Sequence, residues 1–323
     1  MFFKDKLCVV TGGSGFVGTH MVKALAAQGA RIRVPLHHHP MKVTGLDVET
    51  VGGDLSKQDD CRRVFAGADC VFHCAGAVSA AGVTVNNPMS AITANLVLTA
   101  NVLEAAWATG VDRIQIFGSS TGYPVSTHPI REDEMWSGPT HPSYFGYGWM
   151  RRYLERMGEF VQSRSSTKVI IVRPTATYGR HDEFDPKTSH VIPSLIRKAV
   201  AKMTPFEVWG TGDEIRDFLH IEDLIRGCLL ATEKMPTADP VNIGYGQVVT
   251  IRDIVRHILD AAGHDADVFF DATKPTTIPV RMVDCNKAKE LLGFEPRISL
   301  RDGLADTVAW YKAQVAAGLL SAE

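Results

Sequence analysis

The chain carries the sequence TGGSGFVG between an apolar segment (7–10) and a stretch of helical periodicity (19–28). The apolar segment predicts a buried strand, and the periodic stretch predicts a helix. Gly12 allows a tight turn, Gly15 lets a pyrophosphate approach the backbone at the helix N-terminus, and Gly18 lets the helix pack closely on the strand. The segment therefore predicts a strand–turn–helix unit that binds a dinucleotide.

The alternation of apolar strands and amphipathic helices continues through the first half of the chain. Further strands are expected at 31–34, 70–73, 113–117 and 169–172, with helices near 59–65, 89–109 and 145–163. Strands that alternate with helices form parallel sheets covered on both faces. We expect an α/β fold: a Rossmann-type doubly wound parallel sheet with a smaller α/β substrate lobe in the C-terminal half.

The rhythm of strands and helices loosens after Pro174. We place a dinucleotide-binding domain at residues 1–175 and a substrate-binding lobe at 176–323, and we expect a segment near 215–245 to exchange with the first domain. Helices are expected in the lobe near 191–201, 251–262 and 300–312.

Charge and composition exclude several classes of protein. The chain has 34 Lys+Arg, 36 Asp+Glu and a net charge of −2, without the basic stripe of a nucleic-acid binder or a polybasic membrane-binding run. Because charges interrupt the N-terminal segment and no run approaches ~20 apolar residues, we expect a cytoplasmic protein that does not associate with membranes. The six cysteines form no CxxC motif, so neither a disulfide framework nor a metal site is expected. The run at 37–39, three histidines, is interpreted as a solvated loop.

Two further segments lie where a dinucleotide bound along the edge of the predicted sheet would pass. Asp54 and Leu55 follow Gly53 after a third predicted strand, between those at 31–34 and 70–73, where a carboxylate can accept the adenine amino group. Ala75 and Gly76 follow the strand at 70–73 with small side chains. The second strand ends without an acidic residue for the ribose hydroxyls. Arg33 and His37 can instead face a 2′-phosphate, so the sequence favours NADP over NAD. The predicted cofactor-binding residues are Gly12, Gly15, Phe16, Val17, Gly18, Arg33, His37, Asp54, Leu55, Ala75, Gly76, Tyr147, Arg151 and Pro174.

Candidate catalytic residues lie after the strand that ends at Phe117, in the sequence GSSTGYP, and on the next helix, in YGWMR. Ligands of open α/β sheets bind beside the carboxyl ends of the strands, which is where Ser119 is expected. Hydride transfer at a carbinol carbon needs a proton relay on the oxygen. A tyrosine, with a pKa of about 10, serves as that relay when a cation stabilises its phenolate. Arg151 lies one helical turn from Tyr147 and supplies the cation.

Together these segments resemble the extended short-chain dehydrogenase/reductase family, whose members act on nucleotide-sugars. The resemblance covers almost the whole chain and rests on TGGSGFVG, GSSTGYP, RPTATYG (173–179), SHVIP (189–193), VWGTG (208–212), RDFLH (216–220), RMVD (281–284) and LLGF (291–294). Within the family the chain is most similar to the GDP-L-fucose synthases, NADPH-dependent 3,5-epimerase/4-reductases of GDP-4-keto-6-deoxymannose. The resemblance therefore implies a nucleotide-sugar substrate, GDP- or UDP-linked, and a homodimer formed through the helices around Asn95 and Tyr147.

The resemblance also implies roles for individual residues. Ser119 would hold the substrate's keto oxygen, Tyr147 would donate the proton, and His190 would act as an acid/base in epimerisation. The substrate-binding set it implies is Ser119, Ser120, Lys198, Trp209, Arg216 and Arg281, in which the cations suit a diphosphate.

Two residues depart from the family pattern. Arg151 replaces the family's lysine, and Thr121 stands where fucose synthases have a cysteine that works with the histidine. An arginine keeps the positive charge but is bulkier and planar. Three functions remain open: an NADP-linked epimerase/reductase, a 4-epimerase or dehydratase with tightly bound NAD, and a catalytically impaired dinucleotide- or sugar-nucleotide-binding protein.

Overall fold

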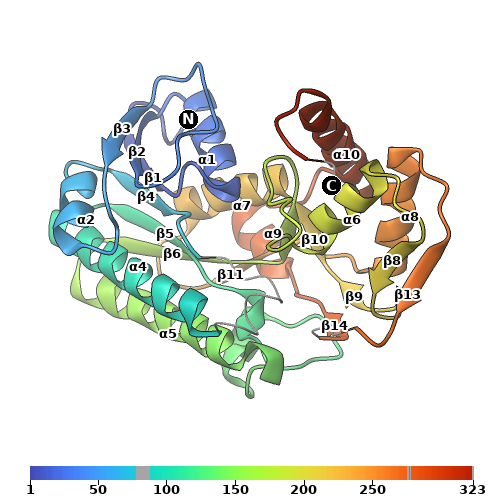
Figure 1. Ribbon diagram of the computed structural model, residues 1–323. Coiled ribbons are helices and arrows are strands. Elements are labelled where there is room, and N and C mark those ends of the chain that lie inside the picture. Colours follow the sequence, from blue (N-terminus) through green and yellow to red (C-terminus); the bar gives the residue numbers. More distant parts are fainter. Residues whose placement is uncertain (78–87, 275, 277, 322–323) are drawn as a thin grey trace.

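Seven parallel strands form the central sheet of the computed structural model, which describes residues 1–77, 88–274, 276 and 278–321 (Figure 1). In spatial order the strands are β11 (Val241–Ile243), β6 (Lys168–Pro174), β5 (Arg113–Phe117), β4 (Cys70–His73), β1 (Leu7–Thr11), β2 (Arg31–Leu36) and β3 (Glu49–Gly52). The chain order reverses beside β1, as in doubly wound sheets. The predicted Rossmann-type α/β fold is confirmed.

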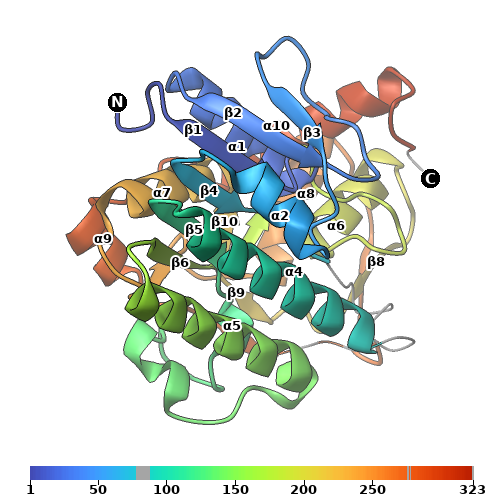
Figure 2. The same cartoon turned by 90° about the vertical axis from the view of Figure 1, so that its left-hand side faces the viewer.

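Helices cover both faces of this sheet because its strands bury alternate residues on opposite sides. Cys8 and Val10 belong to one core cluster, and Val9 belongs to the other. The first face is covered by α1 (Phe16–Ala27), α7 (Ile221–Lys234) and α9 (Asn286–Leu292). The second is covered by α2 (Gln58–Phe65), α4 (Pro88–Thr109) and α5 (Phe145–Arg164), which lie side by side in Figure 2.

The helix after the glycine turn begins earlier than the sequence predicts. We expected it at residue 19, but α1 starts at Phe16, directly after Gly15. Gly15 adopts an extended conformation (φ −82°, ψ −178°) and makes no side-chain cap, so the last residues of the glycine turn already belong to the helix. Backbone N–H groups at this end of α1 therefore face the edge where β1 ends.

The smaller lobe has its own hydrophobic core, built on three helices (Figure 1). These are α6 (Val191–Val200), α8 (Ile251–Ala262) and α10 (Leu300–Ala316). Short strands complete the lobe: β8 (Phe206–Trp209) pairs with β13 (Val268–Asp271), and β9 (Ile215–Arg216) lies between β12 (Val249–Thr250) and β14 (Val280–Arg281). Two more strands, β7 (Ala176–Tyr178) and β10 (Phe218–His220), pair in parallel where the lobe meets the sheet.

The chain passes more than once between the sheet and the lobe. After β10 it forms α7, which packs on α1 and β6, and then β11, which pairs with β6 through Val241 and Val172. The predicted exchange segment, 215–245, spans these elements. The domain boundary at 175 remains a prediction, because residues on both sides of it build the sheet.

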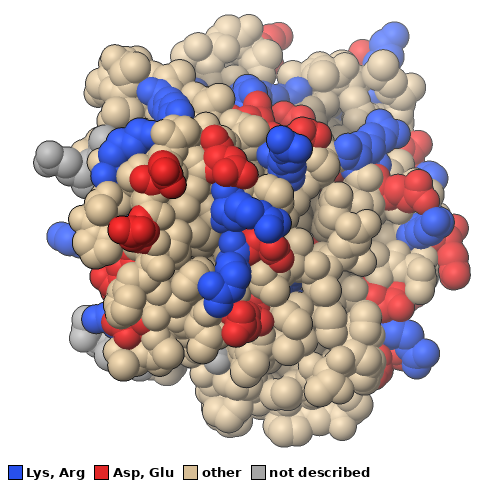
Figure 3. All heavy atoms as spheres, turned by 90° about the vertical axis from the view of Figure 1, so that its right-hand side faces the viewer, with Lys and Arg blue, Asp and Glu red and all other residues tan. Residues whose placement is uncertain are grey.

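Within the described residues, one helix (Met89–Thr109) is long and apolar enough to cross a membrane by length and composition alone. It belongs to α4, which packs between α2 and α5 over the sheet and buries Val102 and Leu103 there. Both signs of charge are interspersed on the face shown in Figure 3, which looks onto the lobe. All six cysteines are free, and the described residues include no cluster of three His, Cys, Asp or Glu that could hold a metal.

Candidate active site

The glycine turn is crowded at two of its three predicted positions. Gly12 has a φ of +64°, and a Cβ there would lie 2.7 Å from the backbone of Ala75. A Cβ on Gly18 would lie 2.1 Å from the carbonyl oxygen of Gly12. Only glycine allows this approach, so the turn packs closely on the loop after β4 and the start of α1 packs closely on the turn.

Hydrogen bonds join this turn to the loop after β4. Thr11 Oγ1 lies 2.9 Å from Nδ1 of His73 and accepts a hydrogen bond from the Ala75 amide at 3.1 Å. Burial, with a smaller contribution from the charge of Arg151, lowers the pKa of His73 to about 3. A neutral His73 therefore ties β1 to β4 in the vicinity of Arg151.

Of the predicted adenosine-side residues, His37 and Asp54 follow the carboxyl ends of β2 and β3, and Arg33 lies within β2. Hydrogen bonds from Ser56 lower the pKa of Asp54, which stays ionised. His37 is exposed. The Arg33 guanidinium donates to Glu49 at 2.9 Å through Nε and to two carbonyls through Nη1, so its charge is already paired. Glu49 was not predicted as a site residue, although the register of parallel strands β2 and β3 places it directly opposite Arg33.

Tyr147 and Arg151 are in direct contact on α5. Nη2 of Arg151 donates to the Tyr147 hydroxyl at 2.6 Å, and Nη1 donates to the Phe117 carbonyl at 3.1 Å. The arginine thus connects the tyrosine to the end of β5, where the catalytic loop begins. We use this name for residues 118–123. The cation expected one turn along the helix is therefore in place beside the phenol.

Ser119 and Thr121 form a local hydrogen-bonded pair in the catalytic loop. Their hydroxyl oxygens lie 2.8 Å apart, and the Thr121 amide donates to Ser119 Oγ at 3.1 Å, which caps the short 3-10 helix Ser120–Gly122. A Cβ on Gly148 would lie 2.6 Å from the Thr121 carbonyl oxygen. The helix turn that carries Tyr147 therefore packs directly on the loop that carries Ser119.

Two arginines of the lobe lie beside this loop. Arg216 on β9 and Arg281 on β14 are register partners, and burial lowers the pKa of both, that of Arg281 to about 10. Nη1 of Arg281 donates to the Ser120 carbonyl, whereas its buried Nη2 has no hydrogen-bond partner among the described residues. An incompletely satisfied buried guanidinium suits a phosphate.

Tyr144 was not predicted as a site residue. Its ring centroid lies 5.6 Å from the Arg281 guanidinium, and its position three residues before Tyr147 could have identified it.

The other predicted substrate residues lie on separate elements of the lobe. His190 occupies the N-cap position of α6 without a side-chain capping bond; the residue is exposed, yet desolvation by the surrounding protein lowers its pKa. Lys198 donates to the Glu207 carbonyl at 2.8 Å, and Trp209 is 51% exposed with its Nε1 bonded to the Glu207 carboxylate. Neither Lys198 nor Trp209 is bonded directly to the pair of arginines.

The chain is similar to known proteins over most of its length. Residues 8–244 match the model of the NAD dependent epimerase/dehydratase family. GDP-L-fucose synthase 1 of Arabidopsis thaliana is 32% identical over 319 residues, covering 97% of this chain and 95% of that protein. The dTDP-4-dehydro-6-deoxy-D-allose reductase of Streptomyces bikiniensis is 29% identical over 316 residues, covering 94% and 95%. The crystal structure of UDP-glucose 4-epimerase from Thermotoga maritima with UDP-glucose superposes with a TM-score of 0.86 at 25% identity, covering 96% of this chain and 99% of that one.

Proposed function

Since the chain belongs to the NAD dependent epimerase/dehydratase family, we propose that it is an NADPH-dependent epimerase/reductase of a 4-keto nucleotide-sugar, of the GDP-L-fucose synthase type. At the level of the family it is an NAD(P)-dependent nucleotide-sugar enzyme. The contact between Arg151 and the Tyr147 hydroxyl carries the finer proposal, because it provides a proton donor with an adjacent cation beside Ser119.

The residues at the sheet edge fit a dinucleotide. Gly12 and Gly18 let the turn, the loop after β4 and the start of α1 approach one another closely, and the N-terminus of α1 has neither a side-chain cap nor an acidic residue in its first turn. The pyrophosphate would bind there, with Asp54 on the adenine side and Ala75 and Gly76 along its path. The bound cofactor supplies the hydride.

In the proposed reaction Ser119 holds the C4 keto oxygen and Tyr147 donates a proton to it. The positive charge of Arg151 then stabilises the phenolate that remains. Phe117 keeps the guanidinium at the end of β5, so the charge cannot swing away from the tyrosine during the proton transfer. Arg216 and Arg281 bind the diphosphate of the sugar nucleotide, with Lys198 and Trp209 on the nucleotide side.

For epimerisation we propose His190 as the acid/base. Its lowered pKa favours the neutral ring near pH 7, the form that removes a proton. Thr121, whose hydroxyl is bonded to Ser119, is a much weaker acid than the thiol it replaces. The reductase half of the reaction is thus better supported than the epimerase half.

The test is an assay with GDP-4-keto-6-deoxymannose, its dTDP- and UDP-linked analogues, and either NADPH or NADH. We expect stoichiometric NADPH oxidation with at least one 4-keto substrate, and slower turnover with NADH. If none of these substrates causes net oxidation of NADPH or NADH, the protein is not a reductase of 4-keto nucleotide-sugars.

The second candidate function is a 4-epimerase or dehydratase that retains NAD. The structural likeness to a UDP-glucose 4-epimerase and the pairing of Arg33 with Glu49, which reduces its availability to a 2′-phosphate, favour it. Such an enzyme would purify with bound NAD and interconvert a 4-hydroxy sugar nucleotide without net consumption of cofactor. The third candidate, a catalytically impaired binding protein, rests on Arg151 and predicts tight binding of both ligands without turnover.

We also propose a cytoplasmic homodimer formed through α4 and α5. The outer surface of these helices exposes large apolar side chains, which in a monomer would face water. They are Val97, Trp107, Phe145, Trp149, Tyr153 and Phe160. Sedimentation of the wild type and of a Tyr153→Glu variant tests the dimer, which the added charge should dissociate.

A further inference from the structure

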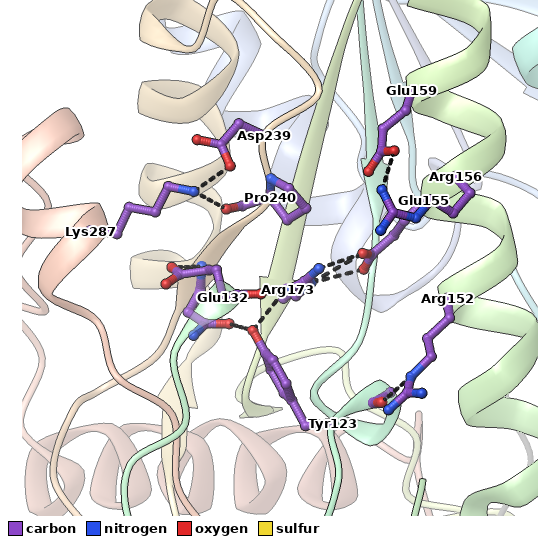
Figure 4. Close-up of polar contacts among 12 residues, drawn as sticks. Tyr123, Glu132, Arg152, Glu155, Arg156, Glu159, Arg173, Asp239, Pro240 and Lys287 are labelled. Carbon is purple, nitrogen blue, oxygen red and sulfur yellow. Dashed lines mark hydrogen bonds and ion pairs between the residues drawn. The ribbon is translucent and has the colours of Figure 1, made fainter. Parts of the chain in front are cut away.

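A cluster of fully buried polar side chains lies beneath the catalytic loop (Figure 4). We call Tyr123, Glu155, Arg173 and Asn242 the buried cluster; none is more than 2% exposed. Arg173 forms a fork with the Glu155 carboxylate, with Nη2 at 2.6 Å and Nε at 3.0 Å. Its Nη1 donates to the Tyr123 hydroxyl at 2.8 Å, and that hydroxyl donates to Asn242 Oδ1 at 2.6 Å.

Both ends of the catalytic loop rest on these side chains. Gly118 directly precedes Ser119, and a Cβ on it would lie 2.2 Å from Glu155 Oε1 and 2.9 Å from Cγ of Arg173. At the other end of the loop, Tyr123 is itself a member of the buried cluster. The backbone that presents Ser119 and Thr121 is therefore held from below at its first and last residues.

The buried cluster also reaches the helix that carries Tyr147. Glu155 lies two turns beyond Tyr147 on α5 and one turn beyond Arg151, so all three residues share one side of the helix. One turn before Glu155 on α5, Arg152 donates to the Gly122 carbonyl at 2.7 Å (Figure 4). The position of α5 relative to the loop is thus fixed by charge-assisted hydrogen bonds.

A third connection leads to the lobe. The amide of Asn242 on β11 donates to the carbonyls of Ile130 and Asp284, at 3.2 Å and 3.0 Å. Asp284 follows β14, the strand whose Arg281 donates to the Ser120 carbonyl. The segment that carries a diphosphate-binding arginine is therefore bonded to the same loop at Ser120 and, through Asn242, at Tyr123.

We propose that Tyr123, Glu155 and Arg173 are positioning residues that set the distance between Ser119 and Tyr147. None of the three reaches the substrate, since all are buried. Within the described residues these contacts leave each charged group partnered, and a satisfied buried network holds one geometry where a surface ion pair would not. The proposal rests on the proposed catalytic roles of Ser119 and Tyr147.

The test uses Tyr123→Phe, which removes one hydroxyl and keeps the ring. Its matched control is Glu159→Gln, which breaks an exposed ion pair with Arg156 on the same helix (Figure 4). In Tyr123→Phe we expect amide hydrogen exchange in the loop to accelerate about tenfold. We also expect kcat to fall roughly 10- to 100-fold while the KM for the sugar nucleotide and the Kd for NADPH change less than about twofold, because misplacement by ~1 Å costs turnover more than binding. The control should match the wild type in all four measurements.

A second variant tests the buried cluster if Tyr123→Phe lowers kcat only slightly. Glu155→Gln keeps the shape of the side chain but removes its charge, and it should give the same pattern with a larger fall in kcat, provided that circular dichroism shows a folded protein. Unchanged loop exchange and kcat in Tyr123→Phe would overturn the proposal, and so would equal losses in kcat and NADPH affinity, which indicate a merely structural role. If the wild type turns over no 4-keto nucleotide-sugar, the proposed function fails, and the exchange measurement alone decides whether the buried cluster positions the loop.

Discussion

The Tyr147 hydroxyl accepts a hydrogen bond of 2.6 Å from Nη2 of Arg151, which lies one helical turn further along α5. The same guanidinium is anchored to the Phe117 carbonyl, where β5 gives way to the catalytic loop. A planar group with two fixed bonds holds its charge in one orientation. In the proposed mechanism, stabilisation of the Tyr147 phenolate depends on this one contact.

Replacing Tyr147 by phenylalanine should remove the proton donor and leave the ring. We expect kcat to fall about 10²- to 10⁴-fold, the range for loss of general acid catalysis, with little change in the Kd for NADPH. Stopped-flow NADPH oxidation and fluorescence titration measure the two effects. Tyr153→Phe, which lies outside the site on the same helix and keeps an aromatic ring at the proposed dimer surface, is the control and should keep wild-type turnover.

Substitution of Arg151 distinguishes an impaired enzyme from an active one. Arg151→Lys should raise kcat several-fold, because an ammonium is smaller than the planar guanidinium and should fit a tight contact with the cofactor ribose better. Arg151→Met, which removes the charge, should lower kcat by about 10²-fold or more. An unchanged kcat in Arg151→Lys would show that the arginine is no handicap.

A methyl group on Gly18 should disrupt the glycine turn at which the pyrophosphate is proposed to bind. Its Cβ would lie 2.1 Å from the Gly12 carbonyl oxygen and 2.8 Å from Cα of Gly13, so the backbone must shift. We expect Gly18→Ala to cost about 1–3 kcal/mol of stability and to weaken NADPH binding at least tenfold. Gly52→Ala, where nothing lies within 4 Å of the added Cβ, should change neither the urea midpoint nor the NADPH titration.

Acid should destabilise the fold through His20. Burial lowers its pKa to about 4, and the neutral ring is bonded to the Arg180 carbonyl at 2.8 Å. An unfolded histidine has a pKa of about 6.5. Between pH 6.5 and 4 the unfolded chain is therefore protonated at His20 while the folded protein is not, and the free energy of unfolding decreases as the pH is lowered. Other groups also change the stability with pH: burial raises the pKa of Asp182 to about 7, which stabilises the fold as the pH falls. Such contributions cancel when the wild type is compared with a variant that differs only at His20.

The comparison is between the wild type and His20→Gln, which keeps a donor for the carbonyl. From pH 7 to pH 5 the difference in unfolding free energy should move by about 2 kcal/mol in favour of the glutamine variant. Urea unfolding at both values measures it. A difference that stays constant with pH would show that His20 is not neutral in the folded protein.

Much of the fold follows from local patterns in the sequence. The apolar segments at β1, β4 and β5 and the glycine turn specify a parallel sheet because each signal lies within a few residues. The two-residue strands β9, β12 and β14 carry no such signal, since they exist only through pairing with distant segments. Their neighbours in space, not their composition, make them strands.

The site divides in the same way. The contact between Tyr147 and Arg151 could be predicted because helical spacing places the two side chains one turn apart, and the place of Ser119 after β5 follows from the motif. The partners of Tyr123 could not: Arg173 is 50 residues away and Asn242 is 119 residues away in sequence. Glu49 was missed for a related reason, because its pairing with Arg33 depends on the register of two strands.

The place of β11 at the edge of the sheet affects how the chain is made. A ribosome releases β6 long before β11, so the newly synthesised protein presents an unpaired strand edge until residue 243 has emerged. Such an edge can pair with other chains and start aggregation. Completion of the sheet therefore depends on synthesis of part of the lobe. We expect a fragment that ends between β6 and β11 to aggregate and not to fold independently.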